Sequence, residues 1–237
     1  MIRNNKMKIK FFTLPNILTL CNLLCGCGAT VSALGFDLRT SFVLIVAAAV
    51  FDFLDGFAAV RLKQCSALGV QLDSLADIVS FGVAPSAIHY SMCEMAHSGY
   101  LSFAAFIIAA FSALRLAKFN IDESQKDSFE GLPTPASALF FASCGYLYVE
   151  QELFAVPLWA MLAAGVVMSL LMISRIRMFS FKFHNFTLRD NALRYLFAGG
   201  SIAGVSILGI RAIPIVILAY IGISAYTDMA SRISNKS

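Results

Sequence analysis

Charged residues are scarce in this chain: Asp, Glu, Lys and Arg make up 14% of its 237 residues, against about 25% in a soluble domain. Hydrophobic residues reach 59%, above the roughly 45–50% of soluble domains. A soluble fold is therefore disfavoured, and the chain is predicted to be an all-α polytopic membrane protein. Its net charge of +4 is small and its basic residues form short, separate clusters, so no nucleic-acid partner is indicated.

Paired Cys and His spacings of the kind that bind metals are absent. The six cysteines are scattered, with Cys21, Cys25 and Cys27 inside the first apolar run, so neither a disulfide framework nor a zinc site is predicted. The start, MIRNNKMKIKFFTLPN, is basic and then apolar like a signal peptide, but it lacks an evident small-residue cleavage site. We interpret it as a retained anchor.

Eight apolar runs follow one another, each close to the length of about 20 residues that spans a bilayer core as a helix. They lie near residues 15–35, 40–61, 71–91, 99–118, 133–150, 154–174, 194–209 and 211–229. Only Arg211 and its neighbours separate the last two runs, so a tight hairpin and a pair of half-buried helices both fit there.

Lys and Arg are distributed asymmetrically between these runs. With the N-terminus in the cytoplasm, sixteen of the eighteen basic residues fall on the cytoplasmic side, and Arg39 and Arg211 fall on the other. This bias predicts a multi-pass protein of the inner membrane with both termini cytoplasmic. The bias also supports the number of helices, because one helix more or fewer would divide the basic residues between the two sides of the membrane.

Four aspartates interrupt the apolar pattern in residues 52–77, DFLDGFAAVRLKQCSALGVQLDSLAD. Asp52 and Asp55 are spaced i, i+3 near the cytoplasmic end of the second helix. Asp73 and Asp77 are spaced i, i+4 near the start of the third, so each pair shares one helix face. The polar KQCSALG between them can turn the chain, and we expect the four carboxylates to converge.

Converging carboxylates repel each other in partly apolar surroundings unless cations neutralise them. Ligands that are all oxygen favour hard cations, so we predict Mg²⁺ or Mn²⁺, with Ca²⁺ as the alternative and zinc disfavoured. Two ions fit four aspartates and are a common device for displacement at phosphorus. Gly56 and Gly69 flank the cluster, where a missing Cβ lets a nucleotide or pyrophosphate approach the backbone.

The spacing of these residues resembles the pattern D-x2-D-G-x2-A-R-x8-G-x3-D-x3-D of the CDP-alcohol phosphatidyltransferases. The pattern falls here on Asp52, Asp55, Gly56, Ala59, Gly69, Asp73 and Asp77. The family's Arg directly follows the Ala, whereas here Val60 stands there and Arg61 comes next. One residue turns a side chain by about 100° on a helix. We expect the long Arg61 side chain to reach the phosphates from the helix end.

Further segments are similar to membrane-embedded phosphatidylserine synthases of this family. They are TLPNILTLCNLLCG near the start, DSLADIVSFGVAPS, ALRLAKFN from 113, FEGLPTPAS from 129 and SRIRMFSFK from 174. The resemblance implies CDP-diacylglycerol as donor, L-serine as acceptor, phosphatidylserine and CMP as products, and a homodimer in the bilayer. It also implies a six-helix core followed by about two extra C-terminal transmembrane helices.

These expectations divide the chain into four parts. They are a basic cytoplasmic segment at 1–14, a catalytic transmembrane core at 15–192, an additional transmembrane hairpin at 193–230 and a cytoplasmic tail at 231–237.

The resemblance also implies roles for individual residues. Asp52, Asp55 and Asp73 would hold the metals. Asp77 would share metal ligation with service as general base toward the serine hydroxyl. The metals would offset charge on the donor's pyrophosphate and on the leaving CMP.

Other polar residues have a structural and a functional interpretation. Arg115 and Lys118 are candidates for binding the serine carboxylate, and ordinary positive-inside anchoring explains them equally well. Asn16 and Thr19 would most commonly cap the first helix, with a nucleotide contact as the sharper alternative.

Two alternative functions stay open. The aspartate motif does not distinguish serine from glycerol 3-phosphate, inositol phosphate or choline, although a phosphorylated acceptor would need several converging Arg or Lys residues. SFGVAPS and EGLPTPAS favour serine by resemblance. An ion-coupled transporter would also use intramembrane carboxylates, but near the bilayer midplane, whereas these lie toward a helix end.

Overall fold

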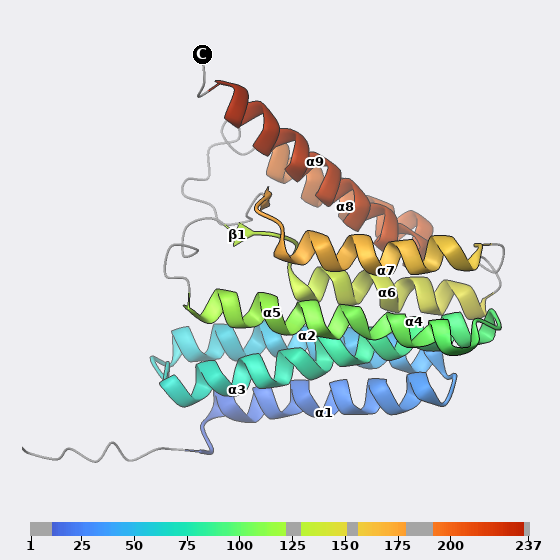
Figure 1. Cartoon of the computed structure of the whole chain (residues 1–237). Helices are drawn as coiled ribbons and strands as arrows, with labels where there is room; N and C mark the ends of the chain where they lie inside the picture. Colours follow the sequence, from blue (N-terminus) through green and yellow to red (C-terminus); the bar gives the residue numbers. More distant parts are fainter. Residues whose placement is uncertain (1–10, 122–128, 151–155, 179–191, 235–237) are drawn as a thin grey trace, which may run out of the picture.

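The computed structural model describes residues 11–121, 129–150, 156–178 and 192–234, and almost all of them are helical (Figure 1). The first half comprises α1 (Leu14–Leu34), α2 (Leu38–Arg61), α3 (Ala67–Ile78), the π-helical η1 (Val79–Val83), α4 (Ala84–Met95), the 3-10 segment η2 (Gly99–Phe106) and α5 (Ile107–Ile121). The second half comprises β1 (Phe129–Glu130), α6 (Thr134–Val149), α7 (Leu158–Ile173), β2 (Arg177–Met178), α8 (Ala192–Leu208), the 3-10 turn η4 (Gly209–Arg211) and α9 (Ala212–Ser234). The all-α prediction is confirmed. Residues 1–10 of the predicted N-terminal segment and 235–237 of the predicted tail lie outside the described residues.

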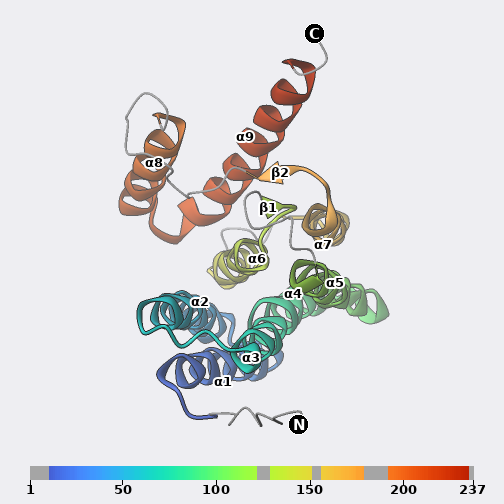
Figure 2. The ribbon, with the colours of Figure 1, turned by 90° about the vertical axis from the view of Figure 1, so that its left-hand side faces the viewer.

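Within the described residues, five stretches are long and apolar enough to cross a membrane. They are Leu14–Leu34, Leu38–Arg61, Ala67–Met95, Gly99–Ile121 and Arg194–Ile233, the last of which contains both α8 and α9. The helices α6 and α7 have 16 residues each, a length of about 24 Å at 1.5 Å per residue, against a core of about 30 Å. α6 packs against α2, α4 and α9 (Figure 2).

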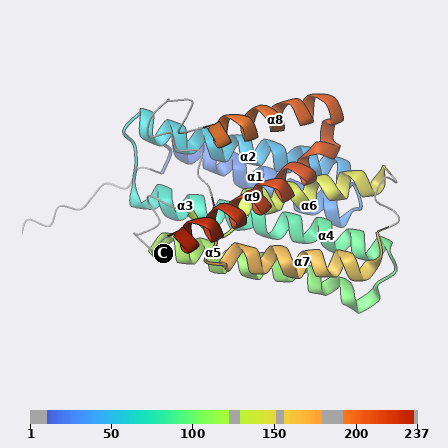
Figure 3. The ribbon, with the colours of Figure 1, turned by 90° about the horizontal axis from the view of Figure 1, so that it is seen from above.

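The last two apolar runs form a hairpin. η4 joins α8 to α9, and Gly209 in this turn has a φ of +60°. α8 packs mainly against α9 and η4, whereas α9 runs obliquely across α6 to reach β2 (Figures 2 and 3). The start of α1 and the end of α9 lie at the same end of the bundle (Figure 1). This agrees with the expected same-side termini, and their cytoplasmic location stays a prediction.

A tight reversal connects α2 to α3 and sets the two helices antiparallel. Lys63, just after the end of α2, takes a left-handed φ of +53°. The Ser66 hydroxyl then accepts a hydrogen bond from the Gly69 N–H at 3.0 Å and caps α3. At the far end of α2, the Asp37 carboxylate accepts from the Thr40 N–H at 3.1 Å, and its hydrogen bonds to Thr40 lower the pKa of Asp37.

Small side chains allow α1, α2, α4 and α6 to approach closely, as is usual between helices in lipid. The alanines of this core are Ala29, Ala33, Ala48, Ala84, Ala87, Ala138 and Ala142. Buried hydroxyls also bridge the helices: Ser41 Oγ donates to the Ala29 carbonyl at 2.8 Å, and Ser91 Oγ donates to the Ala33 carbonyl at 2.7 Å. These bonds satisfy groups for which hydrocarbon offers no partner.

A short antiparallel strand pair ties the entrance of α6 to the exit of α7, and no local pattern indicated it. Phe129 pairs with Met178 and Glu130 pairs with Arg177. The Gly131 N–H extends the connection by donating to the Ile176 carbonyl at 2.9 Å. Met178 is buried in a second apolar cluster that α9 helps to cover. The pair forms between segments nearly fifty residues apart, so periodicity along the chain carries no sign of it.

Gly131 is the residue on which this connection depends most directly. Its φ is +77°, and a Cβ there would clash with the Met172 carbonyl oxygen. We expect Gly131→Ala to lower the free energy of unfolding by roughly 1–3 kcal/mol. The measurement is the Tm of the purified protein in detergent.

Gly199→Ala is the matched control. A Cβ at Gly199 meets nothing within 4 Å, and alanine favours the helix in which it lies. Equal Tm values for the two variants would contradict the role given to Gly131.

Candidate active site

The reversal between α2 and α3 brings the two aspartate pairs together at one end of the bundle. Carboxylate oxygens of Asp52, Asp55 and Asp73 lie within 4.8 Å of one another. Asp77, one helical turn further along α3, lies near Asp52 and Asp73. The expected convergence of the carboxylates is thus confirmed, with three forming the closest group and the fourth beside it.

This arrangement suits a divalent cation. Asp55 and Asp77 are buried, Asp52 and Asp73 are half-buried, and the buried Oδ1 of Asp73 has no hydrogen-bond partner among the described residues. Carboxylates packed this closely repel each other strongly in a medium of low dielectric constant. A hard cation would satisfy the orphaned oxygen and offset the repulsion, and oxygen donors alone are what Mg²⁺ or Mn²⁺ prefers.

One face of α1 supports the cluster through hydrogen bonds. The Thr19 hydroxyl lies 2.6 Å from Asp55 Oδ2, and the Asn22 amide donates to Asp77 Oδ1 at 3.1 Å. Sequence reasoning named Thr19 but missed Asn22, which is fully buried. The sequence does contain an indication of Asn22. Polar residues recur every three positions on this otherwise apolar helix, at Asn16, Thr19 and Asn22, and therefore lie near one face.

The capping role expected for Asn16 and Thr19 is wrong. Thr13 is the N-cap of α1, and its side chain accepts from the Asn16 N–H at 3.4 Å. The Asn16 side chain donates instead to the Phe11 carbonyl at 2.9 Å, while Thr19 already lies in the second turn. Thr19 contacts Asp55 of α2, and Asn16 Oδ1 lies close to Gly69 of α3.

A pocket of about 240 Å³ opens beside the aspartates. Its walls are Thr19, Asp55, Gly56, Ala59, Val60, Gln64, Cys65, Ser66, Gly69, Val70 and Asp73. Four residues expected to contact a nucleotide or pyrophosphate are among them: Thr19, Gly56, Ala59 and Gly69. The pocket and the carboxylate cluster share Asp55 and Asp73, so one ligand could touch both.

The expected contact of Arg61 with the phosphates stays a prediction. The Arg61 side chain is exposed, and Val60 takes the place in the pocket wall. The two positions are adjacent on α2 and differ by a turn of about 100°.

Gly56 lacks a packing reason to be glycine. A Cβ built at this position would meet nothing within 4 Å, although glycine inside a helix costs about 1 kcal/mol relative to alanine. Because Gly56 also lines the pocket, the open space in front of it is available to a ligand.

The two basic residues expected at the site are separated by the structure. Arg115 on α5 interacts electrostatically with Asp77, and its Nη1 donates to Thr134 Oγ1 at 3.4 Å. Its buried Nε has no hydrogen-bond partner among the described residues. Lys118 is exposed, and its Nζ forms an ion pair with Glu130 Oε2 at 3.1 Å. Arg115 is therefore bonded to the start of α6, and Lys118 to β1.

Comparison with known proteins gives a family and close relatives. The sequence model of the CDP-alcohol phosphatidyltransferase family matches residues 12–177. The chain is 34% identical over 174 residues to the CDP-diacylglycerol–serine O-phosphatidyltransferase of Bacillus subtilis, covering 72% of this chain and 92% of that protein. It is 34% identical over 183 residues to the enzyme of the same name from Helicobacter pylori, covering 72% and 73%. It is 30% identical over 168 residues to the archaetidylserine synthase of Methanothermobacter thermautotrophicus, covering 70% of each.

The hydrogen bond from Thr19 to Asp55 is testable without an activity assay. Thr19→Val removes the donor and leaves Asp55 less well oriented, so we expect Mn²⁺ affinity to fall about tenfold or more, as for other residues that orient metal ligands. The measurement is Mn²⁺ titration of the purified protein followed by electron paramagnetic resonance.

Thr30→Val is the control, because both threonines bond a carbonyl four residues earlier in α1 but only Thr19 also contacts an aspartate. Equal affinities for the two variants would show that Thr19 does not support the cluster.

Proposed function

This chain belongs to the CDP-alcohol phosphatidyltransferase family, and we propose that it transfers the phosphatidyl group of CDP-diacylglycerol to the hydroxyl of L-serine, giving phosphatidylserine and CMP. It would thus be a CDP-diacylglycerol–serine O-phosphatidyltransferase, the name carried by several of its relatives. The observation that carries the proposal is the group of Asp52, Asp55 and Asp73 beside a pocket between α2 and α3.

In this proposal the pocket receives the headgroup of the donor. Gly56, Ala59 and Gly69 would let the nucleotide and pyrophosphate lie close to the helix backbones, with Thr19 at the edge. Asp52, Asp55, Asp73 and Asp77 would ligate Mg²⁺ or Mn²⁺, which when bound offsets negative charge on the pyrophosphate and on departing CMP. The diacylglycerol tails would stay in lipid.

Asp77 is the proposed general base. The serine hydroxyl oxygen forms a bond to the phosphatidyl phosphorus, the bond from that phosphorus to CMP breaks, and the hydroxyl proton passes to the Asp77 carboxylate. The Asn22 amide, which donates to one Asp77 oxygen at 3.1 Å, would hold the carboxylate in place.

Arg115 is the proposed partner of the serine carboxylate. Its guanidinium interacts with Asp77 and keeps a buried N–H without a described partner, so a second carboxylate could be bound next to the base. Lys118, already paired with Glu130, is better explained as an anchor. A single arginine in this position suits serine better than a phosphorylated acceptor.

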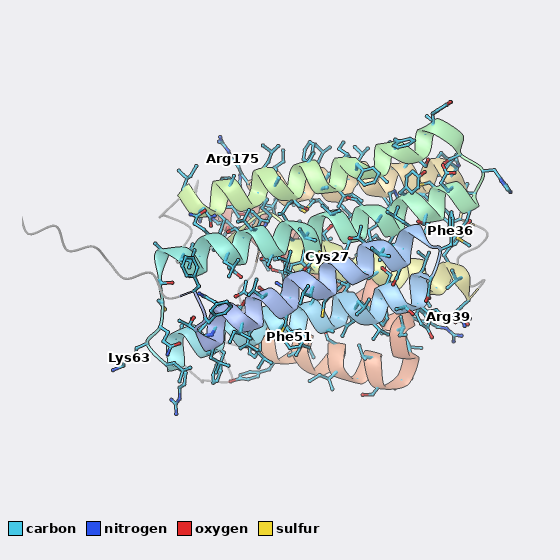
Figure 4. All side chains as sticks on the ribbon, turned by 90° about the horizontal axis from the view of Figure 1, so that it is seen from below. Cys27, Phe36, Arg39, Phe51, Lys63 and Arg175 are labelled. Carbon is cyan, nitrogen blue, oxygen red and sulfur yellow. The ribbon has the colours of Figure 1, made fainter. Side chains whose placement is uncertain are left out.

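The proposed site faces the cytoplasm, in a homodimer embedded in the inner membrane. Lys63 and Arg175 lie at one end of the bundle and Arg39 at the other (Figure 4). The aspartates are near the Lys63 end, which the positive-inside rule assigns to the cytoplasm, where serine and CDP-linked substrate are met. Family membership leaves the transporter interpretation without support.

The acceptor assay is the direct test. We expect purified protein with CDP-diacylglycerol and Mg²⁺ or Mn²⁺ to release CMP when L-serine is added, and chelation of the metal to stop it. Glycerol 3-phosphate, inositol phosphate and choline should give background release. CMP release with one of these and not with serine would leave the family assignment unchanged and show that serine is not the acceptor.

Asp77→Asn should reduce serine-dependent CMP release by about 10²–10⁴-fold, the range for loss of a general base. Asp37→Asn is its control, because Asp37 caps the opposite end of α2 and asparagine is an equally good cap. A fully active Asp77→Asn enzyme would rule out the proposed base.

Arg115→Ala should raise KM for serine about ten- to a hundredfold, the effect of losing a hydrogen bond to a charged group, and leave KM for CDP-diacylglycerol nearly unchanged. Lys118→Ala should change both values by less than about threefold, as expected for an exposed ion pair. Steady-state kinetics with each substrate varied separately makes the comparison. Equal shifts of the two KM values in Arg115→Ala would indicate a structural role instead.

A further inference from the structure

A second cavity lies away from the aspartates, between α4, α6, α7 and the beginning of α9. Its volume is about 420 Å³, within the range of about 300–1,000 Å³ for ligand pockets. None of its lining residues belongs to the pocket beside the aspartates. His89 on its wall is twelve residues beyond Asp77 along α3, η1 and α4, a rise of roughly 18 Å.

The cavity is almost entirely apolar, and part of its wall is exposed on the surface of the bundle. Small side chains at Cys144, Ala160 and Ala164 leave the space. Ile215 and Leu218 of α9 form its outer wall and are more than half exposed, at 58% and 55%. In a transmembrane bundle such exposed side chains face hydrocarbon, so an apolar chain could enter from the bilayer.

One buried polar side chain on the cavity wall lacks a hydrogen-bond partner among the described residues. His89 is 2% exposed, and neither ring nitrogen makes a hydrogen bond of normal geometry within the described residues, although the ring lies close to the Met161 backbone. Gly165 leaves room for the ring, since a Cβ there would come within 3.0 Å of His89 Nε2. An imidazole buried without a good partner is unfavourable unless a ligand supplies one.

One charged residue is among those that line the cavity. Arg211, in the turn between α8 and α9, lines it and is exposed. A guanidinium above an apolar cavity is complementary to a lipid whose headgroup is acidic and whose chain points into the membrane.

We propose that this cavity binds an anionic glycerophospholipid from the leaflet opposite the aspartates, with one acyl chain in the cavity and the phosphate beside Arg211. An ester carbonyl of the lipid accepts a hydrogen bond from His89. The site holds lipid without chemical change and is separate from the donor site proposed above.

The only tryptophan in the sequence reports on this site. Trp159 directly precedes the cavity residues Ala160 and Met161 on α7. Bromine atoms on an acyl chain quench tryptophan fluorescence at short range. Full-length protein in detergent is therefore titrated with phosphatidylglycerol or phosphatidylcholine carrying brominated chains, and unbrominated lipid serves as reference.

We expect saturable quenching by brominated phosphatidylglycerol and only weak, non-saturating quenching by the phosphatidylcholine. Ala164→Phe, which fills the cavity, should abolish the saturable phase. Ala163→Phe, its exposed neighbour on the same helix, should retain it. Arg211→Gln should weaken half-saturation by about two- to fivefold, as for an exposed ion pair. If Ala164→Phe does not fold by thermal unfolding, Cys144→Leu fills the same space from α6.

An unchanged saturable phase in the cavity-filled variant overturns the proposal, and so does equal saturation by the two lipids. Saturation by a brominated free fatty acid but not by phosphatidylglycerol would also overturn it, in favour of a single-chain acid. The fluorescence readout does not depend on phosphatidyl transfer, so failure of this proposal is distinguishable from failure of the proposed activity.

Discussion

Holding several carboxylates together in apolar surroundings is the constraint around which this structure is arranged. Repulsion between them rises as the dielectric constant falls, so the cluster needs donors and cations close by. Thr19 and Asn22 supply donors from α1, and Arg115 supplies a positive charge from α5. One oxygen of Asp73 remains without a described partner, and a metal ion bound there would offset the remaining negative charge.

That support requires α1 to lie very close to the chain following Asp77, and small residues make this possible. Ser80 Oγ donates to the Asn22 carbonyl at 3.0 Å. Position 26 must be glycine here, because a Cβ on it would clash with Ser80. Ser80 belongs to η1, a π-helical turn of the kind often found at functional sites. The geometry of Asn22, and hence of Asp77, therefore depends on helix contacts beyond the aspartate motif itself.

The hairpin after residue 177 is outside the matched family region but is not a separate appendage. Within it, α9 packs against α6 and β2, and Ile213, Ile217 and Ile221 help to cover the second apolar cluster. Ile215 and Leu218 of the same helix close the apolar cavity. One helix thus borders both regions, because its oblique course across α6 carries it from one end of the molecule to the other (Figure 3).

The sequence by itself determined the helical membrane fold, the aspartate spacing and the family, because these depend on hydrophobic run length and on intervals along single helices. Tertiary structure alone decided which neighbouring side chains meet. It buried Asn22 against Asp77, put Val60 and not Arg61 in the pocket wall, and paired Lys118 with Glu130. It also joined β1 to β2 and left a cavity around His89. Helical periodicity states which face a residue occupies, but the partner on the opposing face comes from a segment far away in the chain, and only packing brings the two together.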